Sequence, residues 1–587
     1  MTWPCEDYTT GRWTLASDAK MTKLYGLKGR TELTLPYPIS NVNRHILWLL
    51  GATFVALFLK TSLVLAGVVP FNSDEAIVAL MARHILQGAR PTFFYGQAYM
   101  GSLDAFLVAG GFLFFGEQVW VVRLVQAILY SGTLLTTAWI GKKAFDSWEI
   151  GILAAWLLAV PTVNVTLYTT ISLGGYGEML LLGNSILLVG LHLSDYLKTG
   201  ALKPIFWLSL LFGIFAGLGI WAFGLTLVYS LPVGLYLGVK LVKLLIGVQS
   251  GRLQGWKILV GVPAAASIGV IIGAAPWWLY AANHGFGQLM GELRGGAIAG
   301  VEGLSWSAQV LQHVFNLILL GGTVTFGLRP PWEIRWLALP LIPFALLFWT
   351  AVLVRAARRI KSSSSYFSEM LPLGGVIATL MLGFVFTPFG ADPSGRYFLP
   401  IAVLSTLFAA EMVLHFREQW GHRAYGLIVF ILAFNLIGTL QVAAKYPPGL
   451  TTQFDTVTQV DRRYDDELIA FLMREGEVRG YTNYWISYPL AFESGESLIF
   501  VPRLPYHQDF RYTERDDRYT AYAGLVDQAN KVAYITSNHP ALNEYLRKSF
   551  RDLGVTWQEH QLGDYHIFYR LSSRVLPSQM GLASTKP

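Results

Sequence analysis

The chain has 587 residues, of which 53% are hydrophobic and only 14% are charged, and its mean hydropathy is +0.44. Soluble globular proteins carry about 25% charged residues, so these values exclude a soluble globular chain, a disordered chain and a coiled coil. The net charge is +7, but no basic run alternates with aromatic residues, which argues against nucleic-acid binding, and the single cysteine, Cys5, excludes an internal disulfide and a cysteine-based metal site.

The charged residues are spread unevenly along the chain. Residues 445–587 contain 34 of them in 143 positions, whereas the first 444 residues contain only 47. The first part has a net charge of +9 and the second of −2. So few charges over so long a segment are typical of a membrane protein, and the density after residue 444 is typical of a folded, water-exposed domain. We therefore expect a membrane part, 45–444, followed by a separate domain, 445–587.

The N-terminal segment, residues 1–44, is polar and basic. It lacks the short apolar core and the small-residue cleavage site of a signal peptide, so we expect a cytoplasmic tail. A helix needs about 20 apolar residues to cross a bilayer. Eleven segments of the membrane part are candidates: 46–70, 120–141, 149–168, 177–197, 205–221, 223–239, 258–280, 336–356, 369–388, 397–416 and 424–444. The fifth and sixth are the least distinct, because 205–239 is almost continuously apolar.

Basic residues predict the orientation of these segments. If residues 1–44 lie in the cytoplasm, each cytoplasmic loop contains basic side chains, as the positive-inside rule requires. These are Lys142 and Lys143; Lys198 and Lys203; Lys240, Lys243, Arg252 and Lys257; Arg355, Arg358, Arg359 and Lys361; and Arg417 and Arg423. An odd number of spans then places residues 445–587 on the outer face. The predicted fold is an all-α polytopic membrane protein of about 11 transmembrane helices.

The first long loop, about 71–119, is expected on the outer face and contains the sequence Asn72-Ser73-Asp74-Glu75. An amphipathic helix follows, with Gly88 as its expected C-cap. One interpretation is structural: Asn72 is an N-cap with Glu75 three residues later, a variant of the capping box, and acidic residues in a first turn complement the helix dipole. The other interpretation is functional: a carboxylate held here is a general base for a hydroxyl that attacks an activated sugar.

Residues 95–106 (YGQAYMGSLDAF) add Tyr95, Gln97, Tyr99 and Asp104 to the same loop. Tyrosine and glutamine side chains stack on sugars or hydrogen-bond to them, but tyrosines also form the aromatic belt of membrane proteins. Asp104 either caps a helix, pairs with an arginine or belongs to an acidic site. The apolar stretches 103–115 and 308–321 are too short or too interrupted to span, so we expect them in the interface.

Three basic residues are candidates for binding a phosphate: Arg123 and Arg396, at the expected outer ends of spans, and Lys60, fifteen residues into the first span. An unpaired cation inside a span would be costly, so Lys60 either has a partner and a function or lies near the interface. Arg396 follows a turn sequence and either grips a phosphate in a bidentate fork or pairs with Asp392. Weaker candidates are His284 and Arg294 in the second long loop, about 281–335, and the segment 174–178 with Glu178, which also reads as a tight turn.

The C-terminal domain combines helix and strand patterns. Residues 465–474 have helical spacing, whereas 531–536 (KVAYIT) and 565–571 (YHIFYRL) read as strands. We expect an extracytoplasmic α/β or α+β domain. The stretch 481–488, rich in Tyr and Trp, is compatible with binding a glycan or a partner, and equally with the core of a small domain.

Four features, in this order along the chain, resemble the polyprenyl-phosphate-sugar glycosyltransferases of the C type (GT-C). They are Asp74-Glu75 after the first span with the helix that follows, the YGQAYMGSLDAF segment, Arg123 in VWVVRL, and Arg396-Tyr397 with Pro400 in GRYFLP. The family includes protein O-mannosyltransferases and the transferase that adds aminoarabinose to lipid A. The resemblance covers about residues 45–445. The Asp-Glu pair alone is a weak signal, and the order of the segments is the stronger one.

The resemblance implies an enzyme of a prokaryotic inner (plasma) membrane. It implies inverting transfer, at the outer face, from a sugar on undecaprenyl or decaprenyl phosphate to a hydroxyl of a lipid, glycan or protein acceptor. Asp74 would be the catalytic base, with Glu75 beside it and Asp104 near the family's second acidic position. The lipid A enzyme has an acidic-Lys-Pro-Pro pattern there that this chain lacks, which leaves the phosphate contacts and the acceptor class open.

The resemblance and the arguments from single residues together give a predicted site. Its members are Asp74, Glu75 and Asp104 for catalysis; Arg396, Lys60 and Arg123 for the donor phosphate; and Tyr95, Gln97, Tyr99, Glu178 and Tyr397 for the substrates. No histidines have metal-ligand spacing, and the family has metal-independent members, so we expect no required cofactor. Acidic side chains are nevertheless compatible with a divalent cation.

Three other classes of protein stay open. They are a multispan transporter or flippase for a lipid-linked or small polar substrate; another outer-face enzyme, such as a polysaccharide polymerase, a ligase or an oligosaccharyltransferase; and a non-catalytic scaffold with a sensing tail. Transporters place polar residues at mid-membrane on broken helices, often in repeats. Here the acidic residues collect in the loops and no repeat is visible, which favours the transferase.

Overall fold

The computed structural model describes residues 39–247, 252–295, 305–361, 367–392, 394–507, 510 and 512–582. Most of the expected N-terminal tail and the side chain of Arg294 lie outside the described residues. The chain divides into two compact units, Met1–Leu47 and Trp48–Pro587. Of the first unit, the structure describes the opening turns of helix α1 (Ile39–Leu65). The second unit contains everything that follows.

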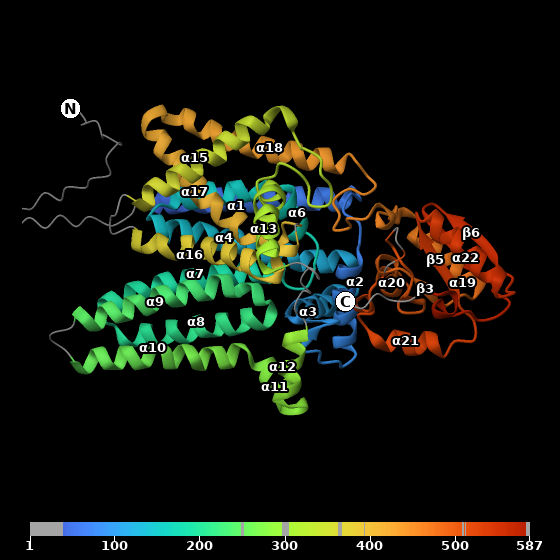
Figure 1. Cartoon of the computed structure of the whole chain (residues 1–587). Helices are drawn as coiled ribbons and strands as arrows, with labels where there is room; N and C mark the ends of the chain where they lie inside the picture. The colour runs from blue at the N-terminus through green and yellow to red at the C-terminus, as the bar shows by residue number, and fades with distance from the viewer. Residues whose placement is uncertain are drawn as a thin grey trace, which may run out of the picture. The chain divides into compact units, whose positions relative to one another are not determined.

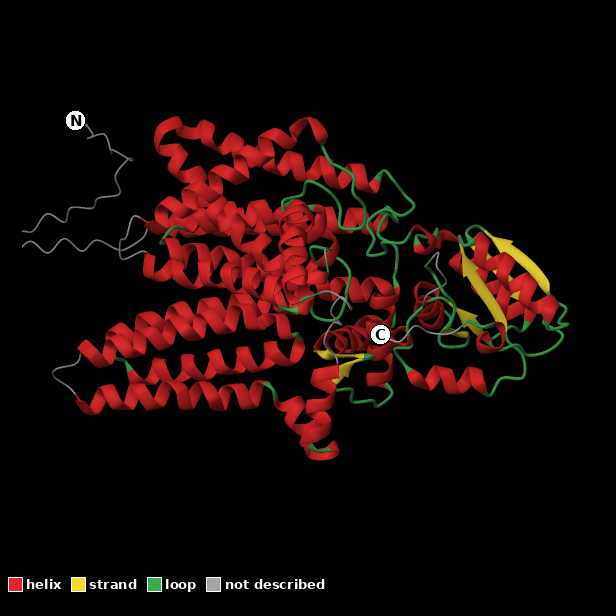
Figure 2. Ribbon diagram, in the orientation of Figure 1, coloured by secondary structure: helices red, strands yellow, loops and turns green. Residues whose placement is uncertain are grey.

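Helices make up the membrane part (Figures 1 and 2). After α1 they are α4 (Val119–Phe145), α5 (Trp148–Ala159), α6 (Val163–Tyr168), α7 (Tyr176–Thr199), α8 (Leu202–Ala222), α9 (Leu227–Gly247), α10 (Arg252–Gly273), α11 (Ala275–His284), α12 (Phe286–Gly295), α13 (Trp306–Phe315), α14 (Gly322–Thr325), α15 (Ile342–Lys361), α16 (Phe367–Phe386), α17 (Leu399–Trp420) and α18 (Gly426–Ala443). The all-α membrane fold is confirmed.

Among the described residues, nine segments are long and apolar enough to cross a membrane, and the last, Arg396–Ala443, contains both α17 and α18. Ten of the eleven predicted spans coincide with these segments. The third, 149–168, is wrong as a single span, because the chain breaks between α5 and α6. Pro161 lies in the break: it has no N–H to donate and it disfavours helical geometry at Val160, which has a φ of −126°.

The indistinct boundary between the fifth and sixth spans is a sharp one in the structure. Helix α8 ends at Ala222, and Phe223 is extended, with a φ of −161°. Phe223 forms an isolated β-bridge with Met100 of the first long loop. The turn between α8 and α9 is therefore attached to that loop.

The first long loop folds into α2 (Ser73–Leu86), a small hairpin of β1 (Phe93–Phe94) and β2 (Gln97–Gly101), and α3 (Leu103–Phe115). The helix predicted after residue 72 is confirmed, and Gly88 has a φ of +108°, one residue beyond the C-cap. Helix α2 is buried on all sides over most of its length, rather than on one apolar face. The stretch 103–115 is α3, and 308–321 spans most of α13 and a π-helical segment.

The C-terminal domain is built on a five-stranded sheet of order β4-β3-β5-β7-β6, in which β3 is parallel to β4 and β5 and the other pairs are antiparallel (Figure 2). The strands are β3 (Arg479–Thr482), β4 (Ile499–Pro502), β5 (Ala533–Ser537), β6 (Gln558–Leu562) and β7 (Tyr565–Tyr569); the helices are α19 (Asp465–Glu475), α20 (Tyr484–Glu493), α21 (Thr520–Asp527) and α22 (Pro540–Asp552). The predicted helix and both predicted strands are confirmed, as is the mixed α/β character.

Helix α20 of this domain packs along α2 of the first long loop (Figure 1). The Ser73 hydroxyl donates to the Tyr484 carbonyl at 2.5 Å, and Arg83 Nη2 donates to the Phe492 carbonyl at 3.1 Å. The Phe492 ring lies 4.5 Å from the Arg83 guanidinium and 5.8 Å from the ring of Phe71. The domain thus rests on the helix that begins with the acidic pair.

Candidate functional site

The acidic pair lies in the first turn of α2. Asn72 is the N-cap, and its side-chain oxygen accepts from the Glu75 N–H at 3.0 Å, so the predicted cap is confirmed. The Glu75 side chain does not return to the cap but turns to Arg123 of α4. Neighbouring residues of a helix point about 100° apart, so Asp74 and Glu75 enter different surroundings.

Glu75 belongs to a buried group that we call the Glu75 cluster. It consists of Glu75, Asp104, Arg123, Gln126, Ser172 and Glu178. Arg123 donates from Nε and Nη2 to the two Glu75 oxygens, both at 3.0 Å, in a bidentate ion pair. Burial raises the pKa of Glu75, and the Arg123 charge counteracts that rise. Among the described residues, the predicted phosphate ligand Arg123 therefore already has an anionic partner.

The second half of the cluster is a pair of carboxyl groups. Asp104 accepts from Gln126 Nε2 at 3.1 Å and from the Ser172 hydroxyl. The charges of Asp104 and Glu178 act on each other, and neither Glu178 oxygen has a hydrogen-bond partner among the described residues. Two buried carboxyl groups close together do not both ionise readily. Burial raises the pKa of Asp104, and the bond from Ser172 counteracts the rise. The predicted residues Asp104 and Glu178 thus meet each other beside Glu75.

Asp74 faces a different group, the Asp74 site, which consists of Asp74, Tyr99, Arg396, Tyr484 and Arg518. The Tyr484 hydroxyl of α20 donates to Asp74 Oδ1 at 2.5 Å. Burial raises the pKa of Tyr484, and the Asp74 charge raises it further, so the phenol stays protonated as a donor. Asp74 is partly exposed, and among the described residues no hydrogen bond reaches its other carboxylate oxygen.

Arg396 lies at the start of the helical segment that leads into α17. Its Nη2 is 2.6 Å from Asp392 Oδ2 and 3.3 Å from the Tyr397 hydroxyl, and its guanidinium lies 5.1 Å from the Tyr397 ring. The side chain is 33% exposed, yet its Nε is buried without an acceptor. The expected pair with Asp392 is therefore present, and part of the guanidinium is still unmatched.

The hydroxyl of Tyr99 is affected by charges from the membrane part and from the C-terminal domain. Burial raises the pKa of its hydroxyl, the charges of Arg396 and Arg518 lower it, and those of Asp74 and Asp392 raise it again. Of the predicted residues, Arg396 and Tyr397 contact each other, and the charges of Asp74 and Arg396 both act on Tyr99. Asp74 contacts the C-terminal domain through Tyr484.

Arg518 reaches this site from a loop of the C-terminal domain. Its backbone N–H donates to the Tyr488 hydroxyl at 2.5 Å, and its Nη1 donates to the Gly96 carbonyl at 3.2 Å. With the Gln97 amide oxygen turned towards it, Nη1 and Nη2 donate to that oxygen at 2.8 and 2.7 Å. Gln97 then donates to the Tyr99 hydroxyl at 3.2 Å. The predicted residue Gln97 therefore orients an arginine.

The two remaining predicted residues lie elsewhere. Tyr95 bonds to His84 Nδ1 at 3.1 Å and stacks on Tyr519 with ring centroids 4.9 Å apart, so it helps to hold the C-terminal domain. Lys60 is buried, and its Nζ donates to the hydroxyls of Thr169 and Thr170 at 2.7 and 3.0 Å and lies 4.3 Å from the Tyr130 ring. The threonines follow α6, so the broken third span supplies the partners of this lysine.

Sequence reasoning missed Tyr484 and Arg518 as residues of this site. The stretch 481–488 gave a signal for Tyr484, because its aromatic residues stood out. Nothing local distinguishes Arg518 from the other arginines of the domain. Of the weaker candidates, His284 is exposed and stacks on Tyr280 with ring centroids 4.3 Å apart.

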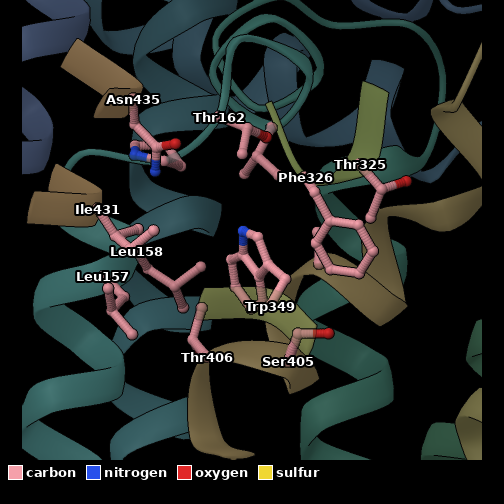
Figure 3. A pocket seen from close by; sticks show the side chains of 13 residues that line it. Leu157, Leu158, Thr162, Thr325, Phe326, Trp349, Ser405, Thr406, Ile431 and Asn435 are labelled. Carbon is pink, nitrogen blue, oxygen red and sulfur yellow. The ribbon is translucent and has the colours of Figure 1, made fainter. Parts of the chain in front are cut away.

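Two cavities lie in or near the membrane part. One of about 410 Å³ is lined by residues 92–98 and Glu292, and therefore shares Gln97 with the surroundings of Arg518. The other lies inside the bundle at the break between α5 and α6, where Figure 3 shows Thr162, Trp349 and Asn435 among its lining residues. It has room for about 20 Å³, roughly one water. Asn435 Nδ2 donates to the Val160 carbonyl, which the break leaves free, at 3.0 Å.

Within the described part of the chain, no group of three or more His, Cys, Asp or Glu side chains is arranged to hold a metal ion. Asp74 has one close partner, a phenol, and Glu75 is taken up by Arg123. The acidic residues are therefore divided between two surroundings rather than gathered around one point.

Comparison with known proteins identifies the fold. No protein-family model and no curated relative matches the sequence. The crystal structure of ArnT from Cupriavidus metallidurans in the apo state matches with a TM-score of 0.53 at 12% identity, over 88% of this chain and 97% of ArnT. The ArnT structure bound to undecaprenyl phosphate matches with a TM-score of 0.52 at 12% identity, over 92% of this chain and 99% of ArnT. An oligosaccharyltransferase from Archaeoglobus fulgidus matches with a TM-score of 0.49 at 14% identity, over 84% of this chain and 69% of that protein.

The likeness to ArnT shows that the chain has the GT-C fold of a multi-pass membrane protein, as the sequence resemblance implied.

Proposed function

We propose that the protein is a membrane glycosyltransferase that moves a sugar from a polyprenyl-phosphate donor to an acceptor hydroxyl. The observation that carries the proposal is the Asp74 site: a partly exposed carboxylate that accepts from a phenol and whose charge acts on Arg518, in a site where Arg518 and Arg396 each have an unmatched Nε. One carboxylate and nearby cations are what this displacement requires. The ArnT structure of the same fold holds undecaprenyl phosphate, which supports a donor of this class.

Asp74 is suited to be the general base. It lies in the first turn of α2, and the bond from Tyr484 fixes one carboxylate oxygen. The other oxygen is left to accept a proton from a hydroxyl within hydrogen-bond distance. Glu75, although adjacent, is buried against Arg123 and cannot take this role without breaking a bidentate ion pair.

The reaction is an inverting displacement at the anomeric carbon. The acceptor oxygen forms a bond to that carbon as its proton passes to Asp74. The bond between the carbon and the phosphate oxygen breaks, and the phosphate leaves with the electron pair. The phosphodiester thereby becomes a phosphomonoester and gains negative charge, so cations near the leaving group stabilise the transition state more than the ground state.

The positions of the basic loops also give an orientation of the chain in the membrane. With residues 1–44 in the cytoplasm, as the basic loops predict, and with α5 and α6 together as a broken eleventh crossing, the Asp74 site and the domain 445–587 lie at the outer face of a prokaryotic inner membrane. Residues 45–444 are the catalytic membrane domain. The cavity beside residues 92–98 lies next to Gln97 and is the proposed route of the acceptor to the site.

The test is a transfer assay on the full chain in lipid nanodiscs. A panel of radiolabelled polyprenyl-phosphate sugars is offered to the wild type and to Asp74→Asn, with and without a chelator. We expect transfer or donor hydrolysis by the wild type in both conditions, and a fall of about 10²–10⁴-fold in the variant, the range that general-base catalysis contributes. No turnover with any donor, together with movement of substrate into sealed vesicles, would replace the transferase by a transporter.

A further inference from the structure

Arginines near the acidic pair differ in how their charge is matched. Arg123 forms a bidentate ion pair with Glu75, and Arg396 has Asp392 as a partner. Arg518 makes no ion pair among the described residues, and its hydrogen bonds go to neutral oxygens of Gly96 and Gln97. No carboxylate of the described residues is therefore within ion-pair distance of its guanidinium, although the charges of Asp74 and Asp516 act on it from farther away.

The position of Arg518 is fixed although its charge is unmatched. Its backbone is held by Tyr488, its guanidinium lies 5.5 Å from the Tyr484 ring, and two of its nitrogens face the Gln97 oxygen. Its Nε is buried and has no acceptor, as is the Nε of Arg396. A buried donor without an acceptor is costly, so an anion that accepted from both Nε atoms would stabilise this arrangement.

Tyr99 connects the two arginines. Arg518 donates to the Gln97 oxygen, and Gln97 donates to the Tyr99 hydroxyl at 3.2 Å. The charge of Arg396 acts on the same hydroxyl, and the charge of Asp74 acts on Tyr99 and on Arg518. Arg396 belongs to the membrane part and Arg518 to the C-terminal domain. The ligand that would match both therefore lies between the two parts and beside the carboxylate.

We propose that Arg518 binds the phosphate of the donor together with Arg396, so that the C-terminal domain completes the donor site. This rests on the proposed function. The phosphate gains negative charge as it leaves, and a guanidinium presents two N–H groups in a plane to such an oxyanion. Loss of Arg518 should therefore weaken the binding of the free polyprenyl phosphate and slow the chemical step.

The experiment compares Arg518→Gln and Arg518→Lys with Arg515→Gln in the full chain. Arg515 is the matched control, because it lies three residues earlier in the same loop with an exposed side chain. The readouts are the binding of undecaprenyl phosphate alone, kcat and KM for transfer or donor hydrolysis, and the unfolding midpoint. We expect Arg518→Gln to lower kcat by about 10²-fold, as the loss of one transition-state donor does, and to weaken lipid-phosphate binding at least about tenfold.

The control Arg515→Gln is expected to keep kcat and the affinity for undecaprenyl phosphate within about twofold of the wild type. Arg518→Lys keeps a point charge without the fork, so it should lie between the wild type and Arg518→Gln. If Arg518→Gln lowers the unfolding midpoint, the partial rescue by lysine still separates a phosphate contact from a structural role. Wild-type binding and kcat in Arg518→Gln would overturn this inference alone. A wild type that neither binds the lipid phosphate nor transfers sugar would overturn the proposed function as well.

Discussion

The Glu75 cluster and the Asp74 site begin at adjacent residues of one helical turn and treat charge in opposite ways. In the cluster, Glu75 forms a bidentate ion pair with Arg123, and Asp104 accepts from Gln126 and Ser172, whereas neither Glu178 oxygen has a partner among the described residues. In the Asp74 site, one carboxylate oxygen has no hydrogen bond among the described residues, and two arginines have buried Nε atoms without acceptors. We infer that the Glu75–Arg123 ion pair stabilises the fold and propose that the unmatched groups around Asp74 bind a ligand.

The cluster predicts the largest effect, on stability. Glu75→Gln leaves Arg123 as a buried cation without its anionic partner, so we expect a loss of about 3–5 kcal/mol in the free energy of unfolding. Asp74→Asn, the matched control one residue earlier, should change it by less than about 1 kcal/mol because Asn still accepts from Tyr484. Denaturation of both variants in nanodiscs measures this. Equal stability of the two would remove the distinction between the groups.

The buried carboxyl group of Asp516, in the C-terminal domain, predicts the next effect, a dependence of stability on pH. Burial raises the pKa of Asp516 to about 7, above its ordinary value in the unfolded chain. An acid with a raised pKa in the folded state stabilises the fold below the unfolded value and loses that contribution as the pH rises through about 7. Asp516→Asn should therefore match the wild type near pH 4 and be more stable at pH 8, by about 2–4 kcal/mol.

Asp527→Asn is the control for that experiment, because its side chain is about half exposed. The charge of Asp74 also raises the pKa of Asp516. Asp74→Asn should therefore move the fall in stability to lower pH. A pH profile that is the same in wild type and Asp516→Asn would show that Asp516 is not buried beside the Asp74 site.

Tyr484 predicts a smaller effect, on catalysis. Tyr484→Phe removes the hydroxyl that donates to Asp74 and keeps the ring. A hydrogen bond to a charged group contributes about 1.5–3 kcal/mol, so we expect kcat to fall by about 10-fold or more. Tyr481→Phe, in a strand of the same domain, should leave kcat unchanged. A wild-type kcat in Tyr484→Phe would contradict the role of this hydrogen bond.

The smallest effect is expected at Lys60. Its threonine partners also donate to helix carbonyls, Thr169 to Val165 and Thr170 to Thr166, so they keep their own bonds when the lysine is lost. We expect Lys60→Met to keep transfer within about twofold and stability within about 1.5 kcal/mol. The transfer assay measures this effect. A tenfold loss of activity in Lys60→Met would show that Lys60 contributes to the donor site.

Local patterns predicted those parts of the molecule that depend on neighbouring residues. The Asn72 cap, helix α2 and ten of the eleven spans follow from capping residues and apolar length. The third span failed because its apolar run concealed the effect of Pro161. The division between Asp74 and Glu75 could not be predicted, since adjacent helical residues differ only in what they meet. The contributions of Tyr484 and Arg518 come from more than 400 residues away, beyond the reach of any local pattern.

The most direct test of the central claim is a structure of the protein with undecaprenyl phosphate bound, determined by electron cryomicroscopy in nanodiscs. We expect the phosphate to lie between Arg396 and Arg518, within hydrogen-bond distance of both guanidinium groups, with Asp74 beside it and the Glu75–Arg123 pair unchanged. A phosphate bound at Arg123 or Lys60, with Arg396 and Arg518 free of it, would contradict the proposed donor site.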